Sequence, residues 1–225
     1  MTAAAATALS APPAVTITLV EPAFQLVPAS VPVGAAGLLA VLAYLLGAIP
    51  FGYIVGRARG VDIRASGSGN IGATNAARVM GKKWGIFVLA CDALKGWLPV
   101  AAAIWLLKLP PVWVALTGLA AFVGHVWPIY LGFKGGKGVA TAAGVLLAVA
   151  PLAAAAGFAA YALCYAIWRI SSIGSLVALG TVLPVMLVFY RVPAYGILIG
   201  AMAGLIVYTH RGNIDRLLKR QESKV

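Results

Sequence analysis

The chain has 225 residues, of which 62% are hydrophobic and 10% are charged. This balance lies far outside the range of soluble domains and predicts an integral membrane protein. The formal net charge of +12 does not indicate binding to nucleic acid, because no stretch could form a soluble folded face that carries the cations, whereas basic loops facing anionic lipid and anionic substrates account for it.

Residues 1–32 are rich in Ala, Pro and Thr and carry Glu21 as their only charge. They lack the basic start and the short apolar stretch of a signal peptide. We expect an N-terminal extension that is disordered at least in part, followed by a membrane domain over residues 33–225.

Apolar segments long enough to cross or half-cross a bilayer follow one another through the membrane domain. They cover residues 33–56, 84–107, 112–131, 138–150, 152–168, 172–189 and 193–209. A single helix over 138–168 would be about 46 Å long, more than a hydrocarbon core of about 30 Å, and Pro151 divides it. We therefore expect an all-α fold of about seven transmembrane helices, with 138–150 the short one.

The distribution of Lys and Arg predicts the orientation. With the N-terminus outside, fourteen of the 17 Lys and Arg lie on inner segments, and only Lys108 and Arg191 lie on outer ones. Because cytoplasmic segments carry the excess of positive charge, we expect the N-terminus outside and the C-terminus inside. The first polar loop, two inner turns and the C-terminal tail then share the cytoplasmic face.

The first polar loop reads GSGNIGATNAARVMGKK from Gly67 to Lys83. Glycine backbone approaches an anion closely, the side chains of Ser68, Asn70, Thr74 and Asn75 offer neutral hydrogen bonds, and Arg78 supplies a permanent charge, so the pattern favours phosphate binding over a merely flexible loop. Residues 67–72 satisfy G-x-G-x-x-G, but no strand precedes them and no acidic residue follows at the required distance. A dinucleotide site is excluded.

A second glycine-rich motif, GFKGGKGVAT, covers residues 132–141 at the start of the short helix. Its N–H groups and Lys137 are suited to a phosphate at a helix N-terminus. Gly138 follows Lys137 where a Walker A loop requires Ser or Thr, so this is not that motif. A turn with snorkelling lysines explains the motif about equally well when it is taken alone.

Two polar groups interrupt the apolar segments. Asp92 and Lys95 are three residues apart, which favours a neutralising structural pair over a functional role of Asp92 toward the cytoplasmic side. A histidine near the end of a span, such as His125, is commonly a packed, hydrogen-bonded residue, but it lies only seven residues before Gly132, close enough to support the second motif. Cys91 lies inside an apolar run, as does the second cysteine, so we expect neither a disulfide nor a metal site.

Further candidates lie at the remaining inner segments. His210 and Asn213 are three residues apart and can share one helical face, although a basic helix on lipid headgroups explains the tail better when it is taken without the other loops. One of Ser171 and Ser172 is expected to cap the sixth helix, which leaves the other free to reach a phosphate.

The blocks GAIPFGYIVGR, DIRASGSGNIGATNAARVMGKK, DALKG, GHVWPIYLGFKGGKGVAT, SSIGSL and HRGNIDRLL, in this order over residues 38–224, resemble the bacterial acyl-phosphate:glycerol-3-phosphate acyltransferase family, PlsY. The resemblance implies a seven-helix inner-membrane enzyme without a cofactor. It implies transfer of a fatty acyl group from acyl phosphate to glycerol 3-phosphate, giving lysophosphatidic acid, and coupling to an enzyme that makes acyl phosphate.

The resemblance assigns roles by motif. It implies that Ser68 and Arg78 in the first loop, and His210 and Asn213 in the tail, are catalytic. The glycerol-phosphate-binding loop falls on Gly135, Gly136, Lys137 and Gly138, and Glu222 takes the place of the structural tail glutamate. From the residues themselves, we expect Asn70, Thr74, Asn75 and Ser172 to be further substrate contacts. Arg220 replaces the glycine that the family usually has two residues before this glutamate, which affects the geometry around Glu222.

The chemistry of the substrates agrees with an interfacial site, because acyl phosphate belongs in the bilayer and glycerol 3-phosphate in the cytosol. We expect Arg78 and Lys137 to hold phosphate, and Ser68 and Asn213 to orient the acceptor hydroxyl or the acyl carbonyl. His210 either binds glycerol phosphate or assists proton transfer, which the leaving phosphate can also perform.

Two other classes of protein compete with this reading. A transporter of a small phosphate ester would use cationic turns and the Asp92–Lys95 pair, but it should show an internal repeat and a midplane site, and no convincing repeat is present. A lipid-binding scaffold explains the basic tail but not the spacing in residues 67–83.

Overall fold

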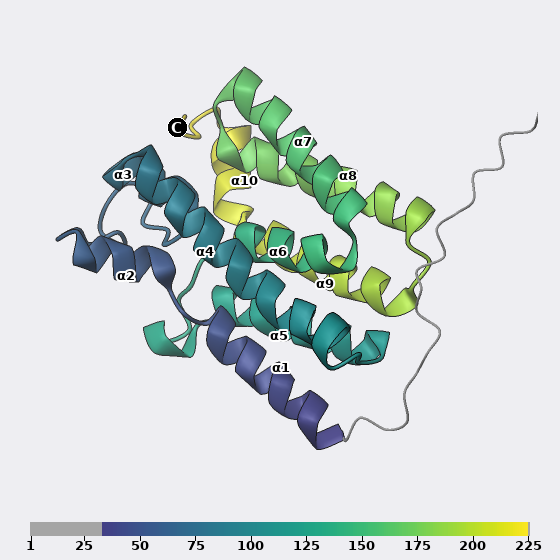
Figure 1. The fold of residues 1–225 in the computed structure, drawn as a ribbon. Coiled ribbons are helices and arrows are strands. Elements are labelled where there is room, and N and C mark those ends of the chain that lie inside the picture. Colours follow the sequence, from purple (N-terminus) through teal and green to yellow (C-terminus); the bar gives the residue numbers. More distant parts are fainter. Residues whose placement is uncertain (1–32, 225) are drawn as a thin grey trace, which may run out of the picture.

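The computed structural model describes residues 33–224, and this part of the chain is all helical. Its helices are α1 (Val33–Gly47), α2 (Phe51–Ala58), α3 (Ala73–Met80), α4 (Lys82–Ala101), the π-helix η1 (Ala102–Leu106), α5 (Pro111–Val126), the 3-10 helix η2 (Ile129–Leu131), α6 (Val139–Val149), α7 (Pro151–Trp168), α8 (Ser171–Phe189), α9 (Pro193–Thr209) and α10 (Arg211–Leu218). Figure 1 shows them as a bundle with α2, α3 and α10 at one end. The extension expected at residues 1–32 lies outside the described residues.

The expected apolar segments all correspond to helices. Within residues 33–224, five are long and apolar enough to span a membrane: Val33–Ala58, Lys82–Leu106, Pro111–Leu131, Pro151–Trp168 and Ser171–Phe189. A sixth candidate is the pair α9 and α10, bent by 56°, and α6 is a shorter apolar helix. The all-α membrane fold is confirmed, with the short helix where it was expected and Pro151 as the first residue of α7.

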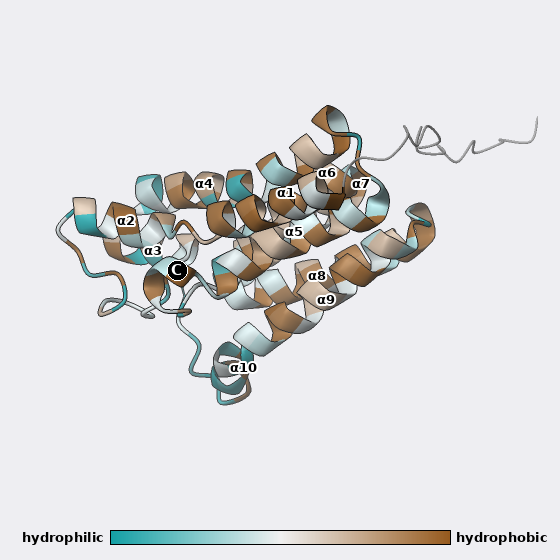
Figure 2. Cartoon of the chain, turned by 90° about the horizontal axis from the view of Figure 1, so that it is seen from below, coloured by the Kyte–Doolittle hydropathy of each residue, from teal (hydrophilic) through white to brown (hydrophobic). Residues whose placement is uncertain are grey.

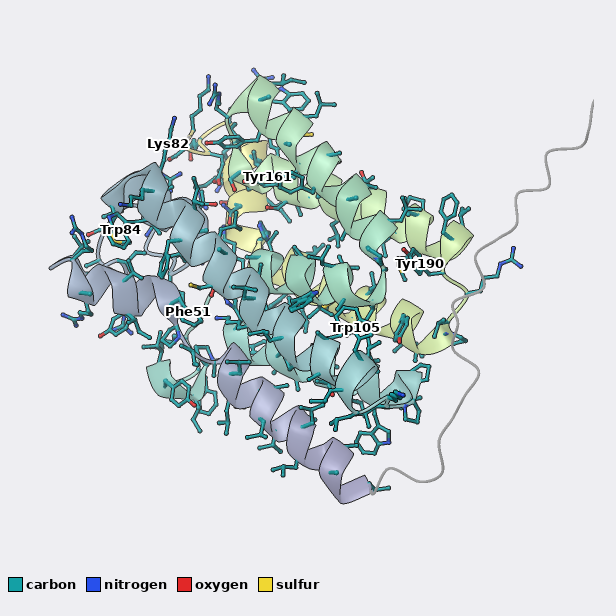
Figure 3. All side chains as sticks on the ribbon, viewed as in Figure 1. Phe51, Lys82, Trp84, Trp105, Tyr161 and Tyr190 are labelled. Carbon is teal, nitrogen blue, oxygen red and sulfur yellow. The ribbon has the colours of Figure 1, made fainter. Side chains whose placement is uncertain are left out.

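The outer surface of the bundle is apolar, as a surface in contact with lipid must be. Phe158, Leu187 and Ile197 are 70%, 80% and 74% exposed. Figure 2 shows the hydrophilic residues gathered at the end that carries α2, α3 and α10. In Figure 3, Lys82 and Trp84 lie at this polar end and Trp105 and Tyr190 at the opposite one, so that aromatic side chains flank the apolar surface at both ends.

Close helix packing holds the glycine-rich loop and the second span together. α6 packs along α4, and α1 packs along α5. A side chain on Gly144 of α6 would lie 1.9 Å from the carbonyl oxygen of Ala93, so only glycine permits this contact. The start of α6, where the glycine-rich loop ends, is thereby fixed against the centre of the bundle.

Candidate active site

Two adjoining cavities of about 240 and 350 Å³ lie at the polar end, between the first polar loop, the glycine-rich loop and the junction of α9 with α10. Asn70, Gly135, Lys137, Thr209 and Arg211 line both of them. The larger one is also lined by Ser68, Gly69, Gly212, Asn213 and Arg216. The structure thus brings together the three segments that the sequence singled out.

Asn75 organises the first polar loop from within. Its Oδ1 accepts a hydrogen bond of 2.8 Å from the N–H of Ser68, and its Nδ2 donates to the carbonyl oxygens of Ile63, Ser66 and Asn70 at 2.9 to 3.0 Å. The side chain is only 1% exposed. Asn75 therefore holds the loop that presents Ser68, a structural role beyond the substrate contact that its position in the motif predicted.

Thr74 also has a different role from the expected substrate contact. Its Oγ1 lies 2.9 Å from Oγ of Ser171, which in turn lies 2.9 Å from the hydroxyl of Tyr161. These hydroxyls connect α3 to the hairpin of α7 and α8. The expected serine cap is absent too, because α8 follows Ile170 without a side-chain capping hydrogen bond.

The glycine-rich loop is held by the end of α5. The N–H groups of Gly135 and Gly136 donate to the carbonyl oxygens of Val126 and His125, at 3.2 and 3.1 Å. These two N–H groups are consequently not available to a phosphate, contrary to the expectation for this motif. The side chain of the next residue, Lys137, lines both cavities instead.

Positive charge is concentrated at Lys137. Burial lowers the pKa of its ammonium group to about 8, Glu222 opposes this shift, and the charges of Arg216 and Arg78 add to it. Arg78, half-buried on α3, is therefore near enough to act on the same space. An anion that enters this region would meet three cations whose mutual repulsion it relieves.

The junction between α9 and α10 places His210 beside Lys137. The hydroxyl of Thr209 donates to the carbonyl oxygens of Ile206 and Lys137. A hydroxyl that bonds to a carbonyl of the preceding turn, as here to Ile206, favours a bend in the helix. The His210 ring is buried, and its Nδ1 lies 2.8 Å from the oxygen of Ile206. Burial and Lys137 lower its pKa to about 4, so the imidazole is neutral near pH 7 with Nε2 as an acceptor.

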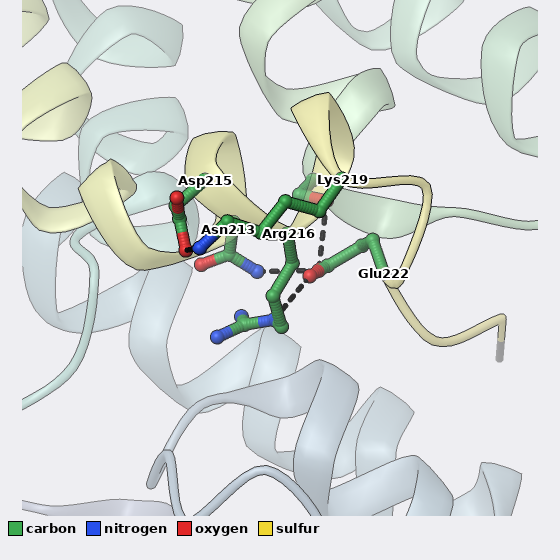
Figure 4. A network of polar contacts seen from close by, with 6 residues as sticks. Asn213, Asp215, Arg216, Lys219 and Glu222 are labelled. Atoms are coloured by element: carbon green, nitrogen blue, oxygen red, sulfur yellow. Dashed lines mark hydrogen bonds and ion pairs between the residues drawn. The ribbon is translucent and has the colours of Figure 1, made fainter.

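Glu222 folds back from the tail onto the site. Its carboxylate accepts hydrogen bonds from Ser172, Asn213 and Arg216, and Figure 4 shows Asn213 and Arg216 converging on it. Burial raises the pKa of Glu222, but these hydrogen bonds outweigh that effect and hold it below its ordinary value. Two of the expected site residues, Asn213 and Ser172, thus meet through one structural carboxylate, whereas His210 bonds to Ile206 instead.

The end of α10 sets the position of Glu222. Arg220 donates its N–H to the oxygen of Leu217 and Gln221 donates to Arg216, the pattern of a Schellman motif, in which the residue at position 220 is left-handed. Arg220 has a φ of +56°. The substituted arginine therefore adopts the backbone conformation that glycine adopts more easily.

Sequence reasoning missed two cations of the site. Arg211 lines both cavities and stacks on the Tyr208 ring at 4.3 Å, and Arg216 lines the larger cavity while it holds Glu222. The spacing of three residues between Asn213 and Arg216 was the available signal, since residues three apart share a helical face.

The expected structural pair is present behind the glycine-rich loop. Lys95 Nζ lies 2.8 Å from Asp92 Oδ1, and both side chains are at most 3% exposed.

The described residues include no group of three or more His, Cys, Asp or Glu suited to a metal ion.

Comparison with known proteins places this chain in a family. Residues 37–220 match the family model described as glycerol-3-phosphate acyltransferase. The glycerol-3-phosphate acyltransferase of Myxococcus xanthus is 49% identical over 83% of this chain and 97% of that protein, and that of Trichlorobacter lovleyi is 48% identical over 81% and 93%.

Two solved structures are similar to the whole bundle. The crystal structure of PlsY (YgiH), an integral membrane glycerol 3-phosphate acyltransferase, in its glycerol 3-phosphate form is 40% identical, with a TM-score of 0.82 over 85% of this chain and 96% of that one. The lysophosphatidic acid form gives 0.80 at 39% identity, over 85% and 95%. The chain belongs to the glycerol-3-phosphate acyltransferase family, and it is a multi-pass membrane enzyme of phospholipid synthesis.

Proposed function

We propose that the acyl donor is acyl phosphate and that transfer to glycerol 3-phosphate takes place in the two adjoining cavities. The observation that carries this proposal is the meeting of cationic side chains with Ser68 and Asn213 at the polar end of an apolar bundle. An acyl phosphate can keep its chain in the bilayer there while its anionic head reaches the same cavity as a water-soluble phosphate ester.

The proposed reaction needs positioning more than a strong base. The acceptor hydroxyl oxygen attacks the acyl carbonyl carbon, the bond from that carbon to the phosphate oxygen breaks, and the departing phosphate takes the hydroxyl proton. His210 is a weak base because its pKa is about 4, so we assign it a hydrogen bond to glycerol 3-phosphate through Nε2 and assign the proton to the phosphate.

The remaining roles in the proposed reaction are assigned to the cationic side chains, to Asn213 and to Ser68. Lys137, Arg78 and Arg216 hold phosphate groups, because the charges of Arg78 and Arg216 both act on Lys137 at the cavity wall. Asn213 donates Nδ2 to Glu222, so its Oδ1 remains to accept a hydrogen bond from the acceptor hydroxyl. The Ser68 side chain, at the wall of the larger cavity, orients the acyl carbonyl.

The proposal includes a location. From the excess of Lys and Arg on one side, we infer that the site lies at the cytoplasmic face of a bacterial inner membrane, with the C-terminus inside. An amphiphilic acyl phosphate must then be supplied at that face by an enzyme that makes it. A reporter fused to the C-terminus should be active in the cytoplasm, and an external signal would overturn the orientation.

One assay tests the donor. Purified protein in detergent or lipid is given glycerol 3-phosphate together with acyl phosphate, acyl-CoA or acyl carrier protein, and lysophosphatidic acid is measured. Product with acyl phosphate alone is expected. Equal turnover with a thioester donor would contradict the proposed donor, and an Arg78→Ala variant with full turnover would contradict the proposed site.

A further inference from the structure

A buried charged cluster lies directly behind the glycine-rich loop. Lys95 Nζ lies 2.8 Å from Asp92 Oδ1 and donates to the carbonyl oxygen of Ile49, also at 2.8 Å. His125 approaches the same carboxylate oxygen, with its Nδ1 at 3.6 Å. All three side chains of the cluster are at most 4% exposed. Charges kept inside a membrane bundle are expensive and indicate a role beyond packing.

The other edge of the His125 ring meets the loop. A side chain on Gly136 would lie 2.2 Å from His125 Nε2 and 2.9 Å from Cε1. The N–H of Gly136 also donates to the His125 carbonyl oxygen at 3.1 Å. Backbone and ring of one residue therefore fix Gly136 from two sides, immediately before Lys137 in the chain.

The ring has little else to orient it. Within residues 33–224, His125 Nδ1 makes no hydrogen bond, so the charge of Asp92 is the strongest polar influence on it. Lys95 keeps Asp92 compensated in the interior. The chain of contacts thus runs from the second span, through the imidazole, to the loop that carries the cavity-lining lysine.

We propose that Asp92 and His125 are positioning residues that set the place of Gly136 and thereby aim Lys137 at the phosphate of glycerol 3-phosphate. Neither touches substrate. The glycine at position 136 is required by the imidazole packed against it rather than by close approach of a phosphate. This inference rests on the proposed role of Lys137 as a phosphate-binding residue.

The first test is the pair Gly136→Ala and Gly136→Ala/His125→Ala, assayed by kcat/KM for glycerol 3-phosphate. The single change should lower this value about 100-fold, because a displacement near 1 Å has such an effect. Removal of the ring makes room for the methyl group, so kcat/KM of the double variant should be at least about tenfold higher than that of Gly136→Ala. A double variant no better than Gly136→Ala would overturn the proposal. Gly200→Ala, where an added methyl group meets nothing within 4 Å, is the matched control.

The second test concerns Asp92. Asp92→Asn should raise KM for glycerol 3-phosphate about tenfold with little change in kcat or in KM for acyl phosphate. Asp215→Asn, on the exposed face of α10, is the matched control. Asp92→Asn/Lys95→Met restores charge balance, and it should keep the raised KM. A normal KM in this double variant would overturn the proposal, because the effect would then come from an unpaired lysine.

Two further measurements distinguish a failure of the positioning role from a failure of the proposed phosphate site or of folding. Size-exclusion profiles and thermal unfolding of each variant in detergent show whether it is folded, and only folded variants are compared. Lys137→Ala serves as the reference for the phosphate site. If it leaves KM for glycerol 3-phosphate unchanged, the proposed phosphate site is wrong. If it raises KM while Asp92→Asn does not, or while Gly136→Ala/His125→Ala is no better than Gly136→Ala, only the positioning role is overturned.

Discussion

The first polar loop and the glycine-rich loop are built differently although both contribute to the same cavities. The first is held from within, by the amide of Asn75, which a side chain on Gly67 would approach to 2.2 Å. The second is held from outside, by the end of α5 and the ring of His125, which a side chain on Gly136 would also approach to 2.2 Å. In each loop a glycine makes room for the group that holds it.

This difference shows what the glycines do not do. In the second loop, the N–H groups of Gly135 and Gly136 are already bonded within the protein, and the proposed phosphate contact is therefore assigned to the side chain of Lys137. In the first loop, the N–H of Ser68 is bonded to Asn75, and its hydroxyl remains. Backbone groups build both loops, and side chains carry the proposed chemistry.

The largest expected effect is at Asn75. Asn75→Ala leaves the loop N–H and carbonyl groups without their buried partner, and each such loss costs about 1–3 kcal/mol. We expect kcat/KM to fall at least about 100-fold as Ser68 is displaced, with a lower unfolding temperature in detergent. Asn70→Ala, at the cavity wall, should affect KM more than stability. Equal stability of Asn75→Ala and the parent protein would show that the loop is not held from within.

Lys137 is expected to show the next effect, on substrate binding. Lys137→Ala removes a charged hydrogen bond to phosphate worth about 1.5–3 kcal/mol, which should raise KM for glycerol 3-phosphate by about 10- to 100-fold. The ammonium group loses its proton as pH rises through about 8, so kcat/KM should fall above that pH. Lys137→Arg should abolish this fall, and an unchanged profile would remove Lys137 from the phosphate site.

The tail is a third segment at the site, and it is held through the carboxylate of Glu222. Glu222→Gln weakens charged hydrogen bonds to Asn213 and Arg216 and should lower stability by about 1–2 kcal/mol. Because the folded-state pKa is depressed, the contribution of the carboxylate is present above its ordinary pKa and is lost as pH falls through the folded-state value. Thermal unfolding measured from neutral to acidic pH should show this loss in the parent protein but not in Glu222→Gln.

The smallest expected effect is at Arg220. Arg220→Gly relieves a left-handed backbone conformation, which favours the folded state by up to about 1 kcal/mol. A small rise in unfolding temperature with unchanged turnover is expected. A fall in turnover would instead show that the Arg220 side chain contributes to the site.

Most of the features that could be predicted depend on residues close together in the sequence. The spacing of Asp92 and Lys95 predicted their pair, since three residues on a helix are one turn apart. The loop-holding role of Asn75 could not be predicted, because its acceptors depend on the folded path of residues 63–70. Arg216 was overlooked because a basic tail, taken by itself, is explained better by lipid headgroups.

The sequence by itself determined the membrane class, the helical segments, the division at Pro151 and the family, because hydropathy, proline and ordered motifs act locally along the chain. Only the tertiary structure decided which loops share a cavity and which polar atoms in them remain free. Those properties depend on hydrogen bonds and close contacts between distant residues, such as His125 with Gly136, and spacing along the chain does not encode them.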